Sequence, residues 1–271
     1  VNKITKKAFL EYGDCSLLDH LAIYSIIPNL ALSLQIPLVV WGENPLMEYG
    51  GSIGDNKIHQ LNKSLLKSHN ILKGKSIEDW VDHGIAISEV QSMIYPSDEE
   101  IKKLDYTPIF LGYYIFWDSQ HNRDMAVSCG FKVREQGPIM GLYDYADLDC
   151  MNIVIHHYFK WLKFGFNRIS DNASNEIRKG RMSREEAIKL VRDKDGYKPP
   201  IEYIRAFCKQ IDISEDFFWE IAEKFRNNKI WEQNENGEWY IKGWIGGDKI
   251  PDRFSYIKLD EHESFYLGDF R

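Results

Sequence analysis

Paired cysteines, an excess of positive charge and an uninterrupted hydrophobic run are all missing from this chain of 271 residues. Its four cysteines stand far apart, without the close pairs of a disulfide framework or a CxxC zinc site. The chain has 34 Lys and Arg against 41 Asp and Glu, and this net charge of −7 argues against a general affinity for nucleic-acid phosphates. We therefore expect no disulfide scaffold and no nucleic-acid partner, and we expect the reducing cytoplasm as the location.

The longest candidate for a membrane segment is the uncharged stretch of residues 21–42, which prolines and polar residues interrupt. A transmembrane helix needs about 20 consecutive, predominantly apolar residues. We therefore expect this stretch to lie in a protein core and the chain to have no membrane span. No basic segment followed by an apolar one opens the chain, so no signal peptide is predicted.

The first 145 residues show the pattern of an α/β layer. Dense apolar positions over residues 18–34 predict a helix that is buried on most sides and bent or started near Pro28. The apolar run of residues 36–45 and the aromatic run of residues 107–117 each predict a fully buried strand, as in parallel sheets. We assign residues 1–145 to a partial Rossmann-like parallel sheet layer.

From about residue 146 the pattern is mainly helical, and we assign residues 146–271 to a helical cap with a small C-terminal hairpin and tail. The predicted elements are a helix within residues 147–166, a short helix with Ser170 as N-cap and Gly180 as stop, a helix with the capping box Ser183-x-x-Glu186, two helices within residues 200–228 with the second after Ser214, and a hairpin at Asn236-Gly237.

The first candidate site is Trp41-Gly42-Glu43-Asn44, at the end of the first predicted strand. Ligands of open parallel sheets bind outside the carboxyl ends of the strands. A carboxylate at Glu43 could hold a metal ion, orient an amine or take a proton, and the Asn44 amide could fix a carbonyl or hydroxyl. The alternative is a turn whose asparagine caps the next helix.

The second candidate site lies within the polar, cationic segment of residues 163–186. If a helix starts at Ser170, then Asp171, Asn175 and Arg178 recur at i, i+4 and i+7 and share one face, with Arg168 just before it. Such a cluster could hold a diphosphate or a sugar carboxylate through bidentate hydrogen bonds. The alternative is a solvated helix face with ordinary ion pairs.

Other reactive side chains give weaker signals. Cys15 and His20 are only two possible ligands, whereas a structural zinc site normally has four, so we predict no metal site. His156 and His157 follow each other in a predicted helix with aromatic neighbours, where one of them can face the core and form a hydrogen bond.

Two long segments resemble a known family, the bacterial N-acetyl sugar amidotransferases of the PP-loop ATP pyrophosphatase superfamily. The first segment is YGDCSLLDHLAIYSIIPNLALSLQIPLVVWGENP, followed by EYGG. The second segment is LDCMNIVIHHYFKWLKFGFNRISDNASNEIRKGRMSREEAIKLVRDKDG. The resemblance covers most of residues 9–196 in the same order, and it implies a PP-loop fold for the first region.

The resemblance also implies an activity. Family members use ATP to activate the acetamido oxygen of an N-acetylated sugar or nucleotide sugar and release pyrophosphate, and ammonia then displaces the activated oxygen to leave an acetamidine. Such sugars enter O-antigen and related surface glycans in lipopolysaccharide biosynthesis. The implied cofactors are ATP and Mg, and the implied partners are glutaminase and cyclase-like subunits that supply ammonia.

The chain also departs from the family pattern. Neither the CxxC-containing opening segment nor an SGGKDS-like phosphate loop occurs in the sequence. We expect a C-terminal portion of a longer enzyme, an enzyme whose other half is another polypeptide, or a decayed relative. The main hypothesis assigns catalysis, at the activated amide or the ATP, to Glu43 and Asn44. It assigns binding of the substrate, the sugar or its nucleotide, to Trp41, Gly42, Arg168, Asp171, Asn175 and Arg178. The alternatives are a non-catalytic nucleotide-sugar or subunit-binding module and, last, a metal hydrolase built on Cys15 and His20.

Overall fold

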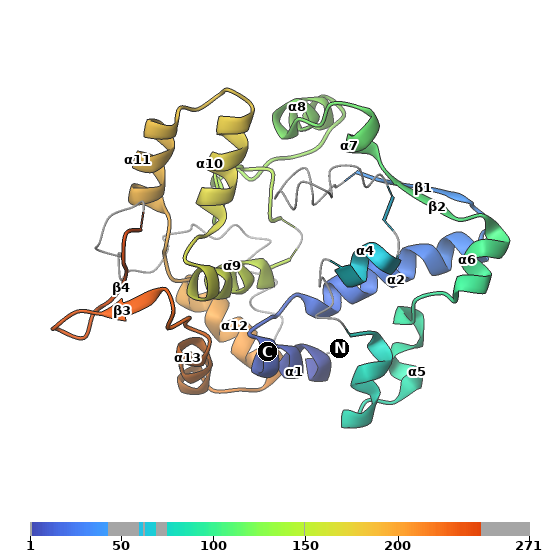
Figure 1. Ribbon diagram of the computed structural model, residues 1–271, viewed down its shortest axis with the longest axis horizontal. Coiled ribbons are helices and arrows are strands. Elements are labelled where there is room, and N and C mark those ends of the chain that lie inside the picture. The colour runs from blue at the N-terminus through green and yellow to red at the C-terminus, as the bar shows by residue number, and fades with distance from the viewer. Residues whose placement is uncertain (1, 43–59, 62, 69–74, 149, 245–271) are drawn as a thin grey trace. The chain divides into compact units, whose positions relative to one another are not determined.

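The computed structural model describes residues 2–42, 60–61, 63–68, 75–148 and 150–244 (Figure 1). The chain forms two compact units. The first consists mainly of Ser16–Met125, and the second contains Ile4–Cys15 and the chain from Ala126 onward. The domain boundary predicted near residue 145 stays a prediction.

A small parallel sheet and short helices make up the described part of the first unit. Its elements are α2 (Leu17–Ser33), β1 (Leu38–Trp41), α4 (Lys63–Ser68), the 3-10 helix η2 (Ile77–His83), α5 (Ile87–Val90), the 3-10 helix η3 (Gln91–Met93), α6 (Asp98–Leu104), β2 (Thr107–Phe110), α7 (Leu111–Tyr114) and most of α8 (Ser119–Ser128).

Strands β1 and β2 pair in parallel, with Leu38 opposite Thr107 and Trp41 opposite Phe110. Phe110 is buried in a cluster that Trp41 also contacts, whereas Leu38 is 52% exposed and Val40 is 50% exposed. The expectation of a fully buried strand is therefore wrong for β1. Its side chains alternate between a packed and an exposed face of the sheet, as in a half-covered strand.

Helix α2 also differs from its prediction. It runs without interruption through Pro28 and buries one face, which includes Leu18, Leu21 and Ala31. A second apolar face is exposed instead of buried, because the described part of the first unit covers only one side of the helix. Its members are Ile23, Ile26, Ile27 and Leu30.

The aromatic run predicted as one strand over residues 107–117 is split. Strand β2 ends at Phe110, and Leu111–Tyr114 form the single-turn helix α7. Tyr114 and Phe116 are exposed, so the second half of the run does not enter the core. An apolar run without strict alternation does not by itself distinguish a strand from a helical turn.

Helices dominate the second unit, as predicted. Most of α1 (Asn2–Tyr12) belongs to it, together with α9 (Asn152–Phe164), α10 (Arg168–Arg178), α11 (Arg184–Lys194), α12 (Ile201–Ile211), α13 (Glu215–Lys224) and the hairpin of β3 (Trp231–Gln233) and β4 (Trp239–Ile241). Helices α10 and α11 lie side by side (Figure 1). Aromatic side chains fill the core between α1, α9, α12 and α13, with Phe9 at ring-centroid distances of 4.9 Å from Phe159 and 5.0 Å from Phe207.

Local sequence signals set the ends of most of these helices. The Ser183–Glu186 capping box is present at the start of α11, and Ser214 caps α13. The prediction that Ser170 caps α10 is wrong, because the helix begins at Arg168 and Asn167 is its N-cap. The Ser170 hydroxyl instead donates a hydrogen bond to the Asp195 carboxylate, at 2.6 Å.

The described residues thus form a mostly helical fold with one parallel strand pair in the first unit. A larger Rossmann-like layer around this pair stays a prediction. None of the described helices has both the length and the apolar character needed to cross a membrane.

Candidate functional site

A row of polar side chains runs along α10, of which the second and third are buried and the first is largely removed from solvent. Arg168, Asn172 and Glu176 follow one another at four-residue intervals, so they lie on one face of the helix. Each contacts the loop of residues 137–147, which precedes α9. We call these three residues the α10 polar row.

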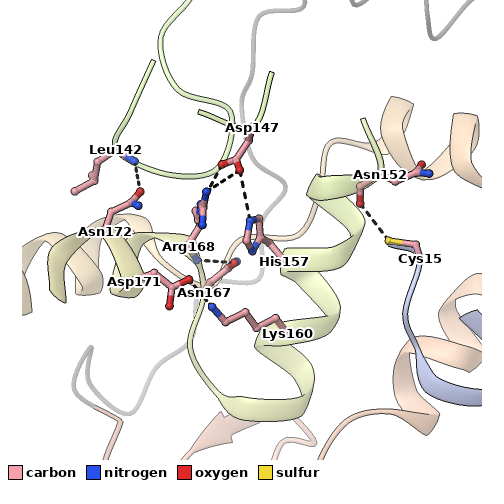
Figure 2. A network of polar contacts seen from close by, with 10 residues as sticks. All are labelled: Cys15, Leu142, Asp147, Asn152, His157, Lys160, Asn167, Arg168, Asp171 and Asn172. Atoms are coloured by element: carbon pink, nitrogen blue, oxygen red, sulfur yellow. Dashed lines mark hydrogen bonds and ion pairs between the residues drawn. The ribbon is translucent and has the colours of Figure 1, made fainter. Parts of the chain in front are cut away.

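At the first position, Arg168 holds Asp147 through two hydrogen bonds (Figure 2). Arg168 Nε donates to Asp147 Oδ2 at 3.1 Å, and a second guanidinium nitrogen donates to Oδ1 at 2.9 Å. Both side chains are largely removed from solvent. Asp147 has a φ of 61°, a left-handed conformation that Asp adopts more readily than most residues. The loop therefore ends in a bidentate, partly buried ion pair.

His157 on α9 lies beside this ion pair, with its Nε2 3.9 Å from Asp147 Oδ1. Burial alone would raise the pKa of Asp147, but the contact with His157 and the charge of Arg168 outweigh it and hold the pKa at about 2. Burial lowers the pKa of His157, Asp147 opposes this, and the positive charges of Arg168 and Lys160 lower it further. At neutral pH Asp147 is therefore ionised and His157 neutral.

At the second position, Asn172 accepts a hydrogen bond from the backbone N–H of Leu142, at 2.9 Å. The preceding residue, Gly141, lies so close to α10 that an added Cβ would stand 2.4 Å from Asn172 Oδ1 and 3.0 Å from Arg168 Cγ. A side chain at residue 141 is therefore incompatible with this approach of the loop to the helix.

Replacing Gly141 with alanine is expected to lower the free energy of unfolding by about 1–3 kcal/mol, because the new methyl group forces the loop away from α10. Urea unfolding measures the change. In an Asn172→Ala background the clashing oxygen is gone, so the cost of the Gly141 substitution should shrink. An equal cost in both backgrounds would contradict the assigned contact.

At the third position, Glu176 joins the loop to the end of α10. Its carboxylate accepts hydrogen bonds from Arg181, at 2.6 Å and 2.9 Å, and from the Tyr143 hydroxyl, at 2.6 Å. Glu176 is buried, so the Arg181 guanidinium compensates its charge away from bulk water.

Two further carboxylates lie near the start of α10. Asp171 forms an ion pair with Lys160 on α9 (Figure 2). Asp195, which is 1% exposed, accepts hydrogen bonds from the Ser170 hydroxyl and the Asn167 backbone N–H through Oδ2. Its Oδ1 has no hydrogen-bond partner among the described residues. Burial raises the pKa of Asp195 to about 6, against the lowering effect of these hydrogen bonds.

The residues predicted for the second site occupy two different environments. Arg168 and Asp171 belong to the buried polar region between α9, α10 and the loop. Asn175 and Arg178 contact each other nearer the end of α10, where Arg178 is exposed. The α10 polar row itself was not predicted, although the four-residue spacing of Arg168, Asn172 and Glu176 is visible in the sequence.

The residues predicted for the first site belong to the first unit. Glu43 and Asn44 lie outside the described residues. Trp41 ends β1, with its ring 5.8 Å from the ring of Tyr24, and its Nε1 has no hydrogen-bond partner among the described residues. An added Cβ at Gly42 would meet no atom within 4 Å. The roles predicted for these four residues stay predictions.

The two residues considered as metal ligands fall in different units. Cys15 is buried and donates a hydrogen bond to the Asn152 carbonyl oxygen, at 3.2 Å (Figure 2). His20 stacks near Tyr24. Within the described ranges, no group of three or more His, Cys, Asp or Glu side chains is arranged to hold a metal ion. His157 is buried, as expected for one member of the histidine pair, but neither of its ring nitrogens has the expected hydrogen bond to any described residue.

The part of the second unit that contains the α10 polar row matches a family model. Residues 141–244 match the family model described as "LPS biosynthesis protein WbpG-like, C-terminal domain". This range contains α9 to α13, the α10 polar row and most of the loop that it holds. No curated protein matches the chain.

Proposed function

We propose that this chain is the sugar-binding and partly catalytic region of an ATP-dependent N-acetyl sugar amidotransferase in lipopolysaccharide biosynthesis. The single observation that carries the proposal is the match of residues 141–244 to the C-terminal domain of WbpG-like LPS biosynthesis proteins. The resemblance of residues 9–196 to N-acetyl sugar amidotransferases gives the reaction. The α10 polar row lies within the matched range and holds the loop of residues 137–147 in place, so that side chains on the loop and on α10 can be positioned for a ligand.

The proposed reaction has two steps. The acetamido oxygen attacks the α-phosphorus of ATP, so that pyrophosphate leaves and an adenylated imidate forms. Ammonia then attacks the imidate carbon, the C–O bond breaks, and AMP leaves with the oxygen to give the acetamidine. Activation is required because an amide oxygen is otherwise a poor leaving group, and exclusion of water protects the imidate from hydrolysis.

Residues of both predicted sites take part in this proposal. Glu43 and Asn44 contact the activated amide or the ATP, next to Trp41 and Gly42. In the second unit, Arg168, Asp171, Asn175 and Arg178 bind the sugar or its nucleotide, directly or by shaping the site. ATP with Mg, and ammonia from glutaminase and cyclase-like subunits in the cytoplasm, complete the proposed system. No described residue is assigned to Mg, since none belongs to a suitable ligand cluster.

Pyrophosphate release tests the proposed reaction. We expect the chain, together with a polypeptide that bears an SGGKDS-like loop, to release pyrophosphate only when ATP, an N-acetylated nucleotide sugar and ammonium are all present. Mass spectrometry should show an acetamidino product. Release that does not depend on the sugar would contradict the proposal.

Glu43→Gln tests the catalytic assignment within the same assay. If the Glu43 carboxylate acts at the reacting amide, its loss should lower kcat by about 100-fold or more, the usual range for a positioned acid or base. The KM for the sugar should change less than kcat. Unchanged amidine formation would remove Glu43 from the mechanism.

A second candidate function is a non-catalytic module that binds a nucleotide sugar or another subunit. The exposed apolar face of α2, which Ile23, Ile26, Ile27 and Leu30 form at three- and four-residue spacing, favours it, because exposed apolar patches are typical of protein interfaces. Calorimetry separates the two functions. Sugar binding without pyrophosphate release in the reconstituted assay would support the binding module.

A further inference from the structure

The loop of residues 137–147 is fixed on two sides. On the apolar side, Ile139 and Met140 are buried with Val154 of α9 and Tyr203 of α12. On the polar side, the α10 polar row holds the loop at Leu142, Tyr143 and Asp147. A loop with both anchors loses little additional conformational entropy when a ligand binds to it.

Two tyrosines lie on this fixed loop. The rings of Tyr143 and Tyr145 are stacked, with centroids 5.0 Å apart and planes inclined by 15°. Both residues are half-buried, so neither is sealed into the core. The hydrogen bond from the Tyr143 hydroxyl to Glu176 fixes the orientation of the first ring, and Arg181 holds Glu176 in turn.

We propose that the Tyr143–Tyr145 pair is a stacking platform for a ring of the ligand, and that Glu176 is its positioning residue. The inference rests on the proposed function and identifies where a nucleotide sugar binds. Because Arg181 compensates the charge of Glu176, the platform suits an uncharged ring, a nucleobase or the apolar face of a sugar, and not the diphosphate. Aromatic stacking of a base contributes about 1–3 kcal/mol.

Titration calorimetry on the full chain tests the platform with three probes: UDP-N-acetylglucosamine, UDP and free N-acetylglucosamine. We expect Tyr143→Ala to weaken binding of UDP-N-acetylglucosamine by about 5- to 150-fold, the equivalent of the stacking energy. Tyr143→Phe keeps the ring and should bind about threefold more weakly than the wild type, since it loses only the preorganising hydrogen bond. If the base stacks, the loss with Tyr143→Ala is reproduced with UDP, and if the sugar stacks, it is reproduced with N-acetylglucosamine.

A matched control lies on the β3–β4 hairpin. The Tyr240 hydroxyl donates to the Glu232 carboxylate at 2.7 Å, which is the same type of hydrogen bond between two residues that do not belong to the loop. Tyr240→Phe should leave binding unchanged. Glu176→Gln should weaken binding in the wild type but not in the Tyr143→Ala background, because Glu176 acts through the Tyr143 ring. Thermal unfolding of each variant shows whether it is folded.

The outcomes distinguish the inference from the proposed function. If the wild type binds UDP-N-acetylglucosamine and folded Tyr143→Ala binds it equally well, the platform is wrong and the proposed function stands. If Tyr240→Phe weakens binding as much as Tyr143→Phe, the effect is not local and the platform is also wrong. If the wild type binds none of the three probes, the proposed function fails and the inference fails with it.

Discussion

Replacement of Arg168 by methionine is expected to lower the free energy of unfolding by about 3–5 kcal/mol. The substitution keeps a long apolar stem but removes both hydrogen bonds to Asp147, whose side chain is only 7% exposed. A buried carboxylate that has lost its counter-ion destabilises the folded protein far more than either the intact ion pair or a neutral side chain at the same place. Urea unfolding at pH 7, followed by tryptophan fluorescence, measures the loss.

Two further variants separate the ion pair from general damage to α10. Adding Asp147→Asn to Arg168→Met removes the stranded charge, so the double variant should recover part of the lost stability. Asn also tolerates the left-handed φ of residue 147. The control is Arg205→Met, which breaks an ion pair between Arg205 and Glu215 whose side chains are 61% and 43% exposed, and it should cost at most about 1 kcal/mol. Equal losses in Arg168→Met and Arg205→Met would refute the assigned role of Asp147.

The difference between local signals and contacts of distant residues explains which parts of the fold could be predicted from the sequence. Helix ends are set by residues within four positions of each other, and so the Ser183–Glu186 capping box and the stop at Gly180, which has a left-handed φ of 71°, can be located in the sequence. Ser170 and Asn167 are both good N-cap residues. What decides between them is Asp195, 25 residues away, which binds the Ser170 hydroxyl. Such a contact has no local signal.

Burial was less predictable than helicity for a related reason. The dense apolar residues of α2 indicate a helix with two apolar faces, but not what covers the second face. The alternating exposure along β1 likewise depends on which faces of the sheet are covered, not on its own residues. For the candidate site, the spacing of Asp171, Asn175 and Arg178 drew attention to this helix, and Arg168 was placed just before it. Of these residues, Arg168 and Asp171 lie in the buried polar region. Their partners Asp147 and Lys160 come from the loop and from α9.

Between pH 7 and pH 4, protonation of Asp195 is expected to stabilise the second unit by about 2 kcal/mol, out of a full effect of about 3 kcal/mol below pH 3.8. Its pKa is about 6 in the folded protein, against an ordinary value of 3.8, and each pKa unit corresponds to about 1.4 kcal/mol. Because the folded state binds this proton more tightly than the unfolded chain, the contribution is complete below pH 3.8 and is lost as the pH rises to 6. This sign is opposite to that of most carboxylates in folded proteins.

Protonation of other groups of the site lowers the stability of the folded protein. The effect of Asp195 is therefore measured as the difference between the wild type and a variant without this carboxylate. The lowered pKa of His157 means that the unfolded chain takes up a proton below about pH 6.5 while the folded protein resists it, and stability falls. Asp147, with a pKa of about 2, contributes stability above pH 3.8 that is lost only as the pH falls towards 2. Asp195→Asn removes the effect of Asp195 on stability and leaves the effects of His157 and Asp147 in place.

The difference in unfolding free energy between the wild type and Asp195→Asn therefore isolates the buried carboxylate. Urea unfolding from pH 4 to pH 7.5 should show the wild type gaining about 2 kcal/mol relative to Asp195→Asn as the pH falls. If the curves of the wild type and Asp195→Asn were parallel, ionisation of Asp195 in the folded protein would cost little free energy. The unpartnered Oδ1 atom and the burial of this side chain would then have no energetic consequence.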